Sequence, residues 1–182
     1  LENATVTSLN DNGIVSKIDG LTIDLIGESK VIAGEEGLSL YGATTLSGSG
    51  MLNVESNFGL YSYDNDVTIE GGCQIDITGS YTGVSFQNTG TLTIDGAILR
   101  VSGESFSLHA PDLQLVNVEI ASPEGAYWNG ETVVDAQDNY VTDQVVIAPY
   151  NIFHGMVSTD WSEPDNWTNR IVPNANSRIT ID

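Results

Sequence analysis

The sequence has very few cationic side chains, a single cysteine and no long apolar run. Among its 182 residues, 5 are Lys or Arg and 25 are Asp or Glu, so the formal net charge is −20 at pH 7. A chain of this charge should repel nucleic acid and anionic lipid surfaces, and we exclude nucleic acid as a partner, whereas calcium ions and cationic partners stay open. The same charge also serves simply to keep a protein in solution.

The only cysteine, Cys73, excludes an intrachain disulfide and a metal site built from cysteines. It follows Gly71-Gly72, where we favour a small structural residue over a reactive thiol. No apolar run approaches the roughly 18 residues of a membrane-spanning helix, so no transmembrane segment is expected. Because the chain begins at Leu1 rather than Met, we expect a mature or trimmed form whose targeting segment, if any, has been removed.

The sequence is rich in glycine and in short segments in which apolar and polar residues alternate. Between Gly59 and Ser107 one pattern occurs twice: a Gly with a short alternating segment, a second segment that ends in Gly, and a third segment. No segment has the length or the 3.6-residue period of a helix. The pattern extends in both directions and starts at Gly13, Gly37, Gly59, Gly83 and Ser107, with spacings of 24, 22, 24 and 24 residues.

A repeat this short cannot bury its apolar side alone and must stack on its neighbours. The sequence therefore predicts an all-β fold: a parallel β-helix of about five to six turns, with three short strands per turn and a cap at each end. The leucine-rich repeat has a similar period, but its L-x-x-L-x-L-x-x-N phrase is missing. We assign residues 1–13 to the N-terminal cap, 14–125 to the turns, 126–149 to the C-terminal cap strands, and 150–182 to a linker and the start of a further β module.

Strand alternation sorts the side chains of each turn into inward and outward rows. In the third segments, Val31 and Ala33 are expected to align with Leu52 and Val54. Among the inward residues, we expect almost complete burial of Ile69, Ile75, Phe86, Ile94, Leu99 and Val101. On the outward side, the sequence predicts that Arg100 lies between Asp76 and Glu119 of neighbouring turns and relieves their repulsion.

An acidic row follows the outward side of the second segments. Within it, Glu70 and Asp95 fall on adjacent turns, about 4.8 Å apart along the stack. Such a spacing suits the carboxylate pair of a retaining glycosidase or a calcium site. The row contains no aromatic or cationic residue, so a solvated acidic stripe is favoured. We assign no metal site and no cofactor, and keep Glu70 and Asp95 as weak candidates for calcium.

The sequence contains few of the residue patterns that catalysis requires. A lyase acting on uronates needs a cation or metal and a base, but the repeats hold only Lys17, Lys30 and Arg100 as cations. His109 and His154 have no Ser, Cys or His partner at a telling spacing, and no phosphate-binding G-x-x-x-x-G-K-[ST] motif is present. We therefore expect a non-catalytic protein and assign no catalytic residue; a polysaccharide lyase or glycoside hydrolase is the less favoured alternative.

Three tyrosines carry the most suggestive pattern. Tyr41, Tyr61 and Tyr63 project outward from the first segments of two consecutive turns, with Tyr41 and Tyr63 at equivalent positions, so their rings can stack. Asp64 and Asp66 follow directly. Flat rings beside carboxylates are what sugar recognition uses, and these five residues are our candidate glycan-binding site. The alternative is a ring ladder that only stabilises the sheet or is covered by another domain.

The repeats of the form Leu92-Thr93-Ile94-Asp95-Gly96, the break at residues 121–126 and the strands at 133–136 and 145–147 together resemble the β-helical "carbohydrate-binding domain-containing" surface lipoproteins of Bacteroidetes. The tail from Asp160-Trp161 through Asn166-Trp167 to Val172-Pro173 is similar to the opening of large secreted, adhesin-like β proteins of the same bacteria. The resemblance implies a right-handed parallel β-helix outside the cell or anchored at the outer membrane. It transfers no functional residues.

Two classes of function remain. The first is a non-catalytic extracellular glycan-binding or adhesive module, with a polysaccharide or glycan as partner. The second is a structural spacer that presents neighbouring domains of a longer chain.

Overall fold

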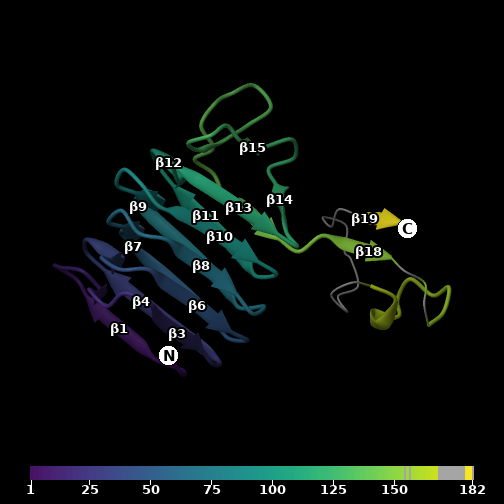
Figure 1. Cartoon of the computed structure of the whole chain (residues 1–182), viewed down its shortest axis with the longest axis horizontal. Helices are drawn as coiled ribbons and strands as arrows, with labels where there is room; N and C mark the ends of the chain where they lie inside the picture. The colour runs from purple at the N-terminus through teal and green to yellow at the C-terminus, as the bar shows by residue number, and fades with distance from the viewer. Residues whose placement is uncertain (154, 156, 168–178, 182) are drawn as a thin grey trace.

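The computed structural model describes residues 1–153, 155, 157–167 and 179–181. Of the expectations above, those for His154 and Val172-Pro173 lie outside these residues. The described chain is nearly all β, and its only helical piece is the short 3-10 turn η1 (Pro164–Asn166). The strands coil into a solenoid of about five turns, joined by parallel pairing (Figure 1). The predicted parallel β-helix is confirmed.

The second segments of the turns form a five-stranded sheet. Each neighbouring pair is parallel, and the order along the sheet follows the chain (Figure 1). Its strands are β3 (Leu21–Leu25), β6 (Thr44–Gly48), β8 (Val67–Glu70), β10 (Thr91–Asp95) and β13 (Asp112–Val116). Each turn therefore contributes one strand, at the register that the repeat spacing predicts.

The third segment of one turn and the first segment of the next share a larger, ten-stranded sheet. In the middle of the solenoid both segments belong to one long strand, namely β7 (Met51–Ser62) and β9 (Gln74–Phe86). Elsewhere they are separate strands: β2 (Ile14–Ser16), β4 (Glu28–Ala33), β5 (Glu36–Leu40), β11 (Ile98–Gly103) and β12 (Phe106–His109). The register shifts between Ser56 and Phe58, where β7 turns from one segment into the other.

The glycine that opens four of the five repeats is explained by close approach between turns. At Gly59, an added Cβ would collide with the Ile77 side chain and with the carbonyl oxygen of Gly83 in the next turn. At Gly83, it would meet Val101 and the carbonyl oxygen of Ser107 in the same way. The repeat spacing in the sequence thus records places where only a hydrogen atom fits between stacked backbones.

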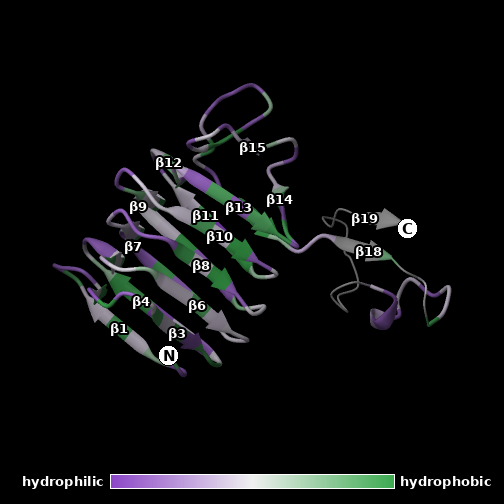
Figure 2. Ribbon diagram, viewed as in Figure 1, coloured by the Kyte–Doolittle hydropathy of each residue, from purple (hydrophilic) through white to green (hydrophobic). Residues whose placement is uncertain are grey.

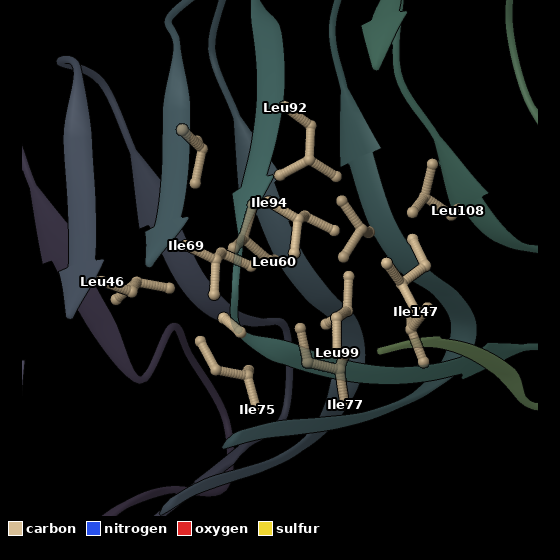
Figure 3. Close-up of a cluster of buried hydrophobic side chains, with 14 of the residues drawn as sticks. Leu46, Leu60, Ile69, Ile75, Ile77, Leu92, Ile94, Leu99, Leu108 and Ile147 are labelled. Atoms are coloured by element: carbon tan, nitrogen blue, oxygen red, sulfur yellow. The ribbon is translucent and has the colours of Figure 1, made fainter. Parts of the chain in front are cut away.

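Stacked apolar side chains fill the space between the two sheets. Leu46, Ile69 and Ile94 stand in register on β6, β8 and β10, and none of them is exposed (Figure 3). Apolar and polar residues alternate along these strands (Figure 2). All six residues predicted to be buried are at most 2% exposed: Ile69, Ile75, Phe86, Ile94, Leu99 and Val101.

Two register predictions are wrong. Val31 pairs with Val54 rather than Leu52, and Ser29 takes the place opposite Leu52. The hydroxyl of Ser29 can stay inside because it accepts a hydrogen bond from the backbone N–H of Ala4, 3.1 Å away. The turn length therefore keeps the register, even where that places a serine in an apolar row.

The second error concerns Glu119. Strand β17 (Val145–Ala148) runs antiparallel between β11 and β14 (Glu119–Ser122), so Arg100 stands in register with Val146 rather than with Glu119. Buried Val145 and Ile147 of β17 close the apolar edge of β11 instead. The other half of the prediction is confirmed, since Arg100 Nη1 lies 2.9 Å from Asp76 Oδ1.

Different elements close the two ends of the solenoid. At the N-terminus, β1 (Thr5–Ser8) pairs in parallel with β4 and adds a strand to the larger sheet. Towards the C-terminus, β15 (Tyr127–Trp128) and β16 (Val133–Val134) pair antiparallel before the chain returns as β17. Beyond the solenoid, β18 (Asn151–Phe153) and β19 (Ile179–Ile181) form a parallel pair (Figure 1). In the part of the chain described, no helix is long and apolar enough to cross a membrane.

Candidate functional site

Tyr41 and Tyr63 stack on each other on the outer side of the larger sheet. They directly follow β5 and β7, and their backbone N–H groups bond to Ser16 and Leu40 of the preceding turns, so they hold equivalent places. Their ring centroids are 4.0 Å apart and their planes differ by 7°, which confirms the expected stacking. Tyr61, two residues before Tyr63 on β7, leans against it with a centroid distance of 4.7 Å.

This stacking changes how the rings meet solvent. The faces that Tyr41 and Tyr63 turn to each other are covered, so no sugar ring can lie between them. Tyr41 stays 41% exposed, while Tyr61 and Tyr63 are half-buried. Beneath them the outward-pointing Ser39 is fully buried. The tyrosines thus present ring edges and one outer face rather than the flat patch expected from the sequence.

Two further aromatic residues, Phe58 and Tyr81, extend this group. Phe58 packs edge-on against Tyr61 at 6.0 Å and lies 5.3 Å from Tyr81, again edge to face. Tyr81 is 51% exposed. The five rings form one continuous row, which we call the aromatic ridge (Tyr41, Tyr63, Tyr61, Phe58 and Tyr81).

Sequence reasoning missed Phe58 and Tyr81 because they lie at the bends between third and first segments. Strand alternation does not say where a side chain points at such a bend. A usable signal was present, however. Both residues come just before the glycine that opens a repeat, Phe58 one residue and Tyr81 two residues ahead of it.

A half-buried carboxylate, Glu36, fixes the tip of Tyr63. Tyr63 donates its hydroxyl hydrogen to Glu36 Oε1 at 2.6 Å, and Ser39 Oγ donates to Oε2. Asn12 Nδ2 donates to the same Oε2 at 3.3 Å. Burial and the hydrogen bond to Glu36 raise the pKa of Tyr63, and burial with the nearby Glu36 charge raises that of Tyr61. Both phenols therefore stay neutral at neutral pH, and the single hydroxyl hydrogen of Tyr63 is engaged with Glu36.

The two aspartates of the predicted site are engaged with the following turn. Asp64 Oδ1 accepts the backbone N–H groups of Asn88 and Thr89 at 2.8 and 3.0 Å. Asp66 Oδ1 accepts that of Thr91 at 2.9 Å. Both side chains are exposed and Asp64 directly follows Tyr63. Their first role is thus to bond one turn to the next, while their charge remains beside the aromatic ridge.

The weak calcium candidates are neighbours, as the spacing predicts. Asp95 of β10 stands in register with Glu70 of β8. Asp95 Oδ1 accepts a hydrogen bond from Asn117 Nδ2 at 3.0 Å. Within the described residues, no group of three or more His, Cys, Asp or Glu is placed to hold a metal ion. Asp135, another acid beside a turn, accepts the backbone N–H groups of Gln137 and Asn139, which is a turn-forming role.

Cys73 belongs to the core. Its side chain is fully buried, and burial raises the pKa of the thiol to about 11.

Two open hollows lie near the ends of the solenoid, lined in part by Leu21 and Ile23 at one end and by Leu115 and Trp128 at the other. Neither includes a residue of the aromatic ridge.

Comparisons with known proteins add no assignment to this geometry. No protein-family model matches the chain, and no curated protein or solved structure gives a significant match.

Proposed function

We propose that this chain is a non-catalytic glycan-binding or adhesive module whose contact surface is the aromatic ridge. The observation that carries the proposal is a row of five rings across consecutive turns, with Tyr41 and Tyr81 open to solvent at its two ends. The outward side of the five-stranded sheet, by contrast, carries mainly Thr, Ser, Asp and Glu. Exposed aromatic area of this kind typically marks an interaction site.

The ridge offers the two kinds of contact that sugars use. The open faces of Tyr41 and Tyr81 suit the apolar side of a pyranose, and the hydroxyls and carboxylates beside them suit its hydroxyl groups. Because the rings belong to consecutive turns of a hydrogen-bonded sheet, they are held in place before a ligand arrives, which lowers the entropy cost of binding. An extended polysaccharide is the glycan shape that such a row fits, and a protein with this role acts at the cell surface or outside the cell.

The test is a glycan array on the intact chain, with and without calcium, followed by affinity measurements on variants. Tyr81→Ala, and the double variant Tyr41→Ala/Tyr63→Ala, should each weaken binding by about 1 kcal/mol or more. Tyr140→Ala is the matched control, because Tyr140 is 62% exposed but lies off the ridge. Ridge variants that keep full affinity would remove the ridge as the binding surface.

A structural spacer is the second candidate, and one observation favours it. Tyr41 and Tyr63 cover each other's faces, and Tyr63 is tied to Glu36. A ladder of this kind also serves to fasten one turn to the next. A wild-type chain that binds nothing on a broad array, but melts earlier when the ridge tyrosines are removed, would support the spacer.

A further inference from the structure

An ammonium group already lies over one end of the aromatic ridge. Lys17 Nζ is 5.5 Å from the centroid of the Tyr41 ring. Because Lys17 belongs to the turn before Tyr41 and Tyr63 to the turn after it, the two cover opposite faces of that ring. The negative face of an aromatic ring attracts cations. The face of Tyr41 that Tyr63 leaves open is thus a place where an amine fits.

Acidic residues occupy chain positions next to several residues of the ridge. The backbone N–H of Phe58 bonds to the carbonyl of Glu35 in the preceding turn. The backbone N–H of Ser105, the residue after Glu104, bonds to the carbonyl of Tyr81. Glu35 thus lies one turn before Phe58, and Glu104 lies one turn after Tyr81. Asp64 directly follows Tyr63, and all three of these acids are exposed. Glu36 lies closer still, bonded to the Tyr63 hydroxyl.

Few cations in the protein balance this charge. Among the Lys and Arg side chains that the structure describes, Lys30 bonds to Glu55 and Arg100 bonds to Asp76. Lys17 alone among them faces the ridge. The chain as a whole carries a formal charge of −20. The ridge therefore combines cation-attracting ring faces with an excess of negative charge.

We propose that the aromatic ridge selects glycans that carry protonated amines, that is, polymers of de-N-acetylated amino sugars, over neutral and acidic glycans. This inference rests on the glycan-binding function proposed above and names its ligand class. The pyranose rings stack on Tyr81 and, where they displace the Lys17 ammonium, on Tyr41, and the sugar ammonium groups lie near Glu35, Asp64 and Glu104. Uronates and sulfated sugars are repelled by the same acids, and a neutral sugar can form hydrogen bonds with them but no ion pair.

A matched pair of ligands tests this selection. The hexamer of β-1,4-linked glucosamine and its fully N-acetylated counterpart share one backbone and differ in whether the nitrogen is charged. Titration of the intact chain should give about tenfold or greater preference for the glucosamine hexamer. The preference should shrink as salt is added, because exposed charges are screened beyond about 8 Å at physiological ionic strength. It should also shrink as the pH rises through the pKa of the sugar amine.

Matched variants separate the ridge from overall charge. Glu35→Gln/Asp64→Asn removes two acids beside the ridge, and the Asn side chain keeps the oxygen that accepts the Asn88 and Thr89 N–H groups. Asp24→Asn/Glu70→Gln removes two exposed acids from the five-stranded sheet. Only the first pair should lower the affinity for the glucosamine hexamer. Lys17→Ala, which frees the Tyr41 face, should raise it.

Each contrary outcome has a distinct meaning. Equal affinity for both hexamers would overturn the selection of amines but leave the glycan-binding function standing. Equal losses in the two acid variants, or an oligolysine of the same charge that binds as tightly, would also overturn it, because charge alone would then explain the binding. A Lys17→Ala chain that binds the glucosamine hexamer more weakly would overturn it for another reason, because the Tyr41 face that Lys17 covers would then not be where the ligand lies. A folded chain that binds neither hexamer nor any other glycan would overturn both proposals.

Discussion

The interior rows of the solenoid and the Tyr41–Tyr63 pair of the aromatic ridge are made in the same way but differ in their exposure to solvent. In both, equivalent positions of consecutive turns place like side chains on top of one another. Leu46, Ile69 and Ile94 are fully buried by this stacking, whereas Tyr41 remains 41% exposed although its ring lies 4.0 Å from that of Tyr63. The interior has no free surface left, and the ridge keeps part of its own. Stability should therefore depend on the interior rows, and the proposed glycan binding on the ridge.

The largest effect should come from a charge inside. Ile94→Asp places a carboxylate in the middle of the apolar stack, and the cost of burying an unpaired charge should exceed about 4 kcal/mol and prevent folding. Thr93→Asp is the matched control, since Thr93 points outward from the same strand between Thr68 and Gln114. Circular dichroism and thermal melting of the two variants show whether each one folds and how stable it is. A soluble Ile94→Asp protein with unchanged melting would show that the interior is not the source of stability.

Repetition explains why the sequence was enough to predict the interior. Inward rows such as Leu38, Leu60 and Val84 follow from the repeat spacing together with strand alternation, and the observed register agrees. Position within a repeat thus carries the information about burial. The prediction failed at Ser29. This polar residue occupies the inward position opposite Leu52, where Val31 was expected.

Features that the repeat does not encode could not be predicted in this way. Strand β17 follows the break in the pattern and pairs with β11 because that edge was open and apolar, which is a property of the folded end rather than of any local phrase. Phe58 and Tyr81 were missed at the bends. Asp64 and Asp66 were assigned to a ligand, yet they also accept backbone N–H groups of the next turn, a role that depends on how the turns stack.

The next largest effect should come from the contact between turns. Gly59→Ala introduces a Cβ that meets Ile77 and the Gly83 backbone, so the solenoid must widen locally. We expect a loss of about 1–3 kcal/mol from this overpacking. Urea unfolding measures this loss of stability, provided that the m-value is compared together with the midpoint. An unchanged midpoint would mean that the turns are less tightly stacked than the interior rows indicate.

A smaller loss is expected on the ridge. Tyr63→Ala removes the ring stacked on Tyr41 and the hydrogen bond to Glu36, but it leaves no cavity inside. The stability should fall by about 1 kcal/mol, which lowers the melting temperature by about 2–4 °C for a chain of this size. Tyr63→Phe, which keeps the ring, should lose less stability than Tyr63→Ala. A drop as large as that of a core truncation would place the ridge among the stabilising rows and favour the spacer.

The smallest effect should come from the ion pair on the outer side of β11 and β9. Arg100 and Asp76 are in register and 2.9 Å apart, but each side chain is about a third exposed, so water screens their attraction. A double-mutant cycle with Arg100→Ala and Asp76→Ala should give a coupling of about 0.2–1 kcal/mol that declines with added salt. A coupling above that range, insensitive to salt, would mean that this outer row is shielded from water by the returning chain around β17. The contrast between a closed interior and an open exterior would then hold for the ridge but not for the face that β17 borders.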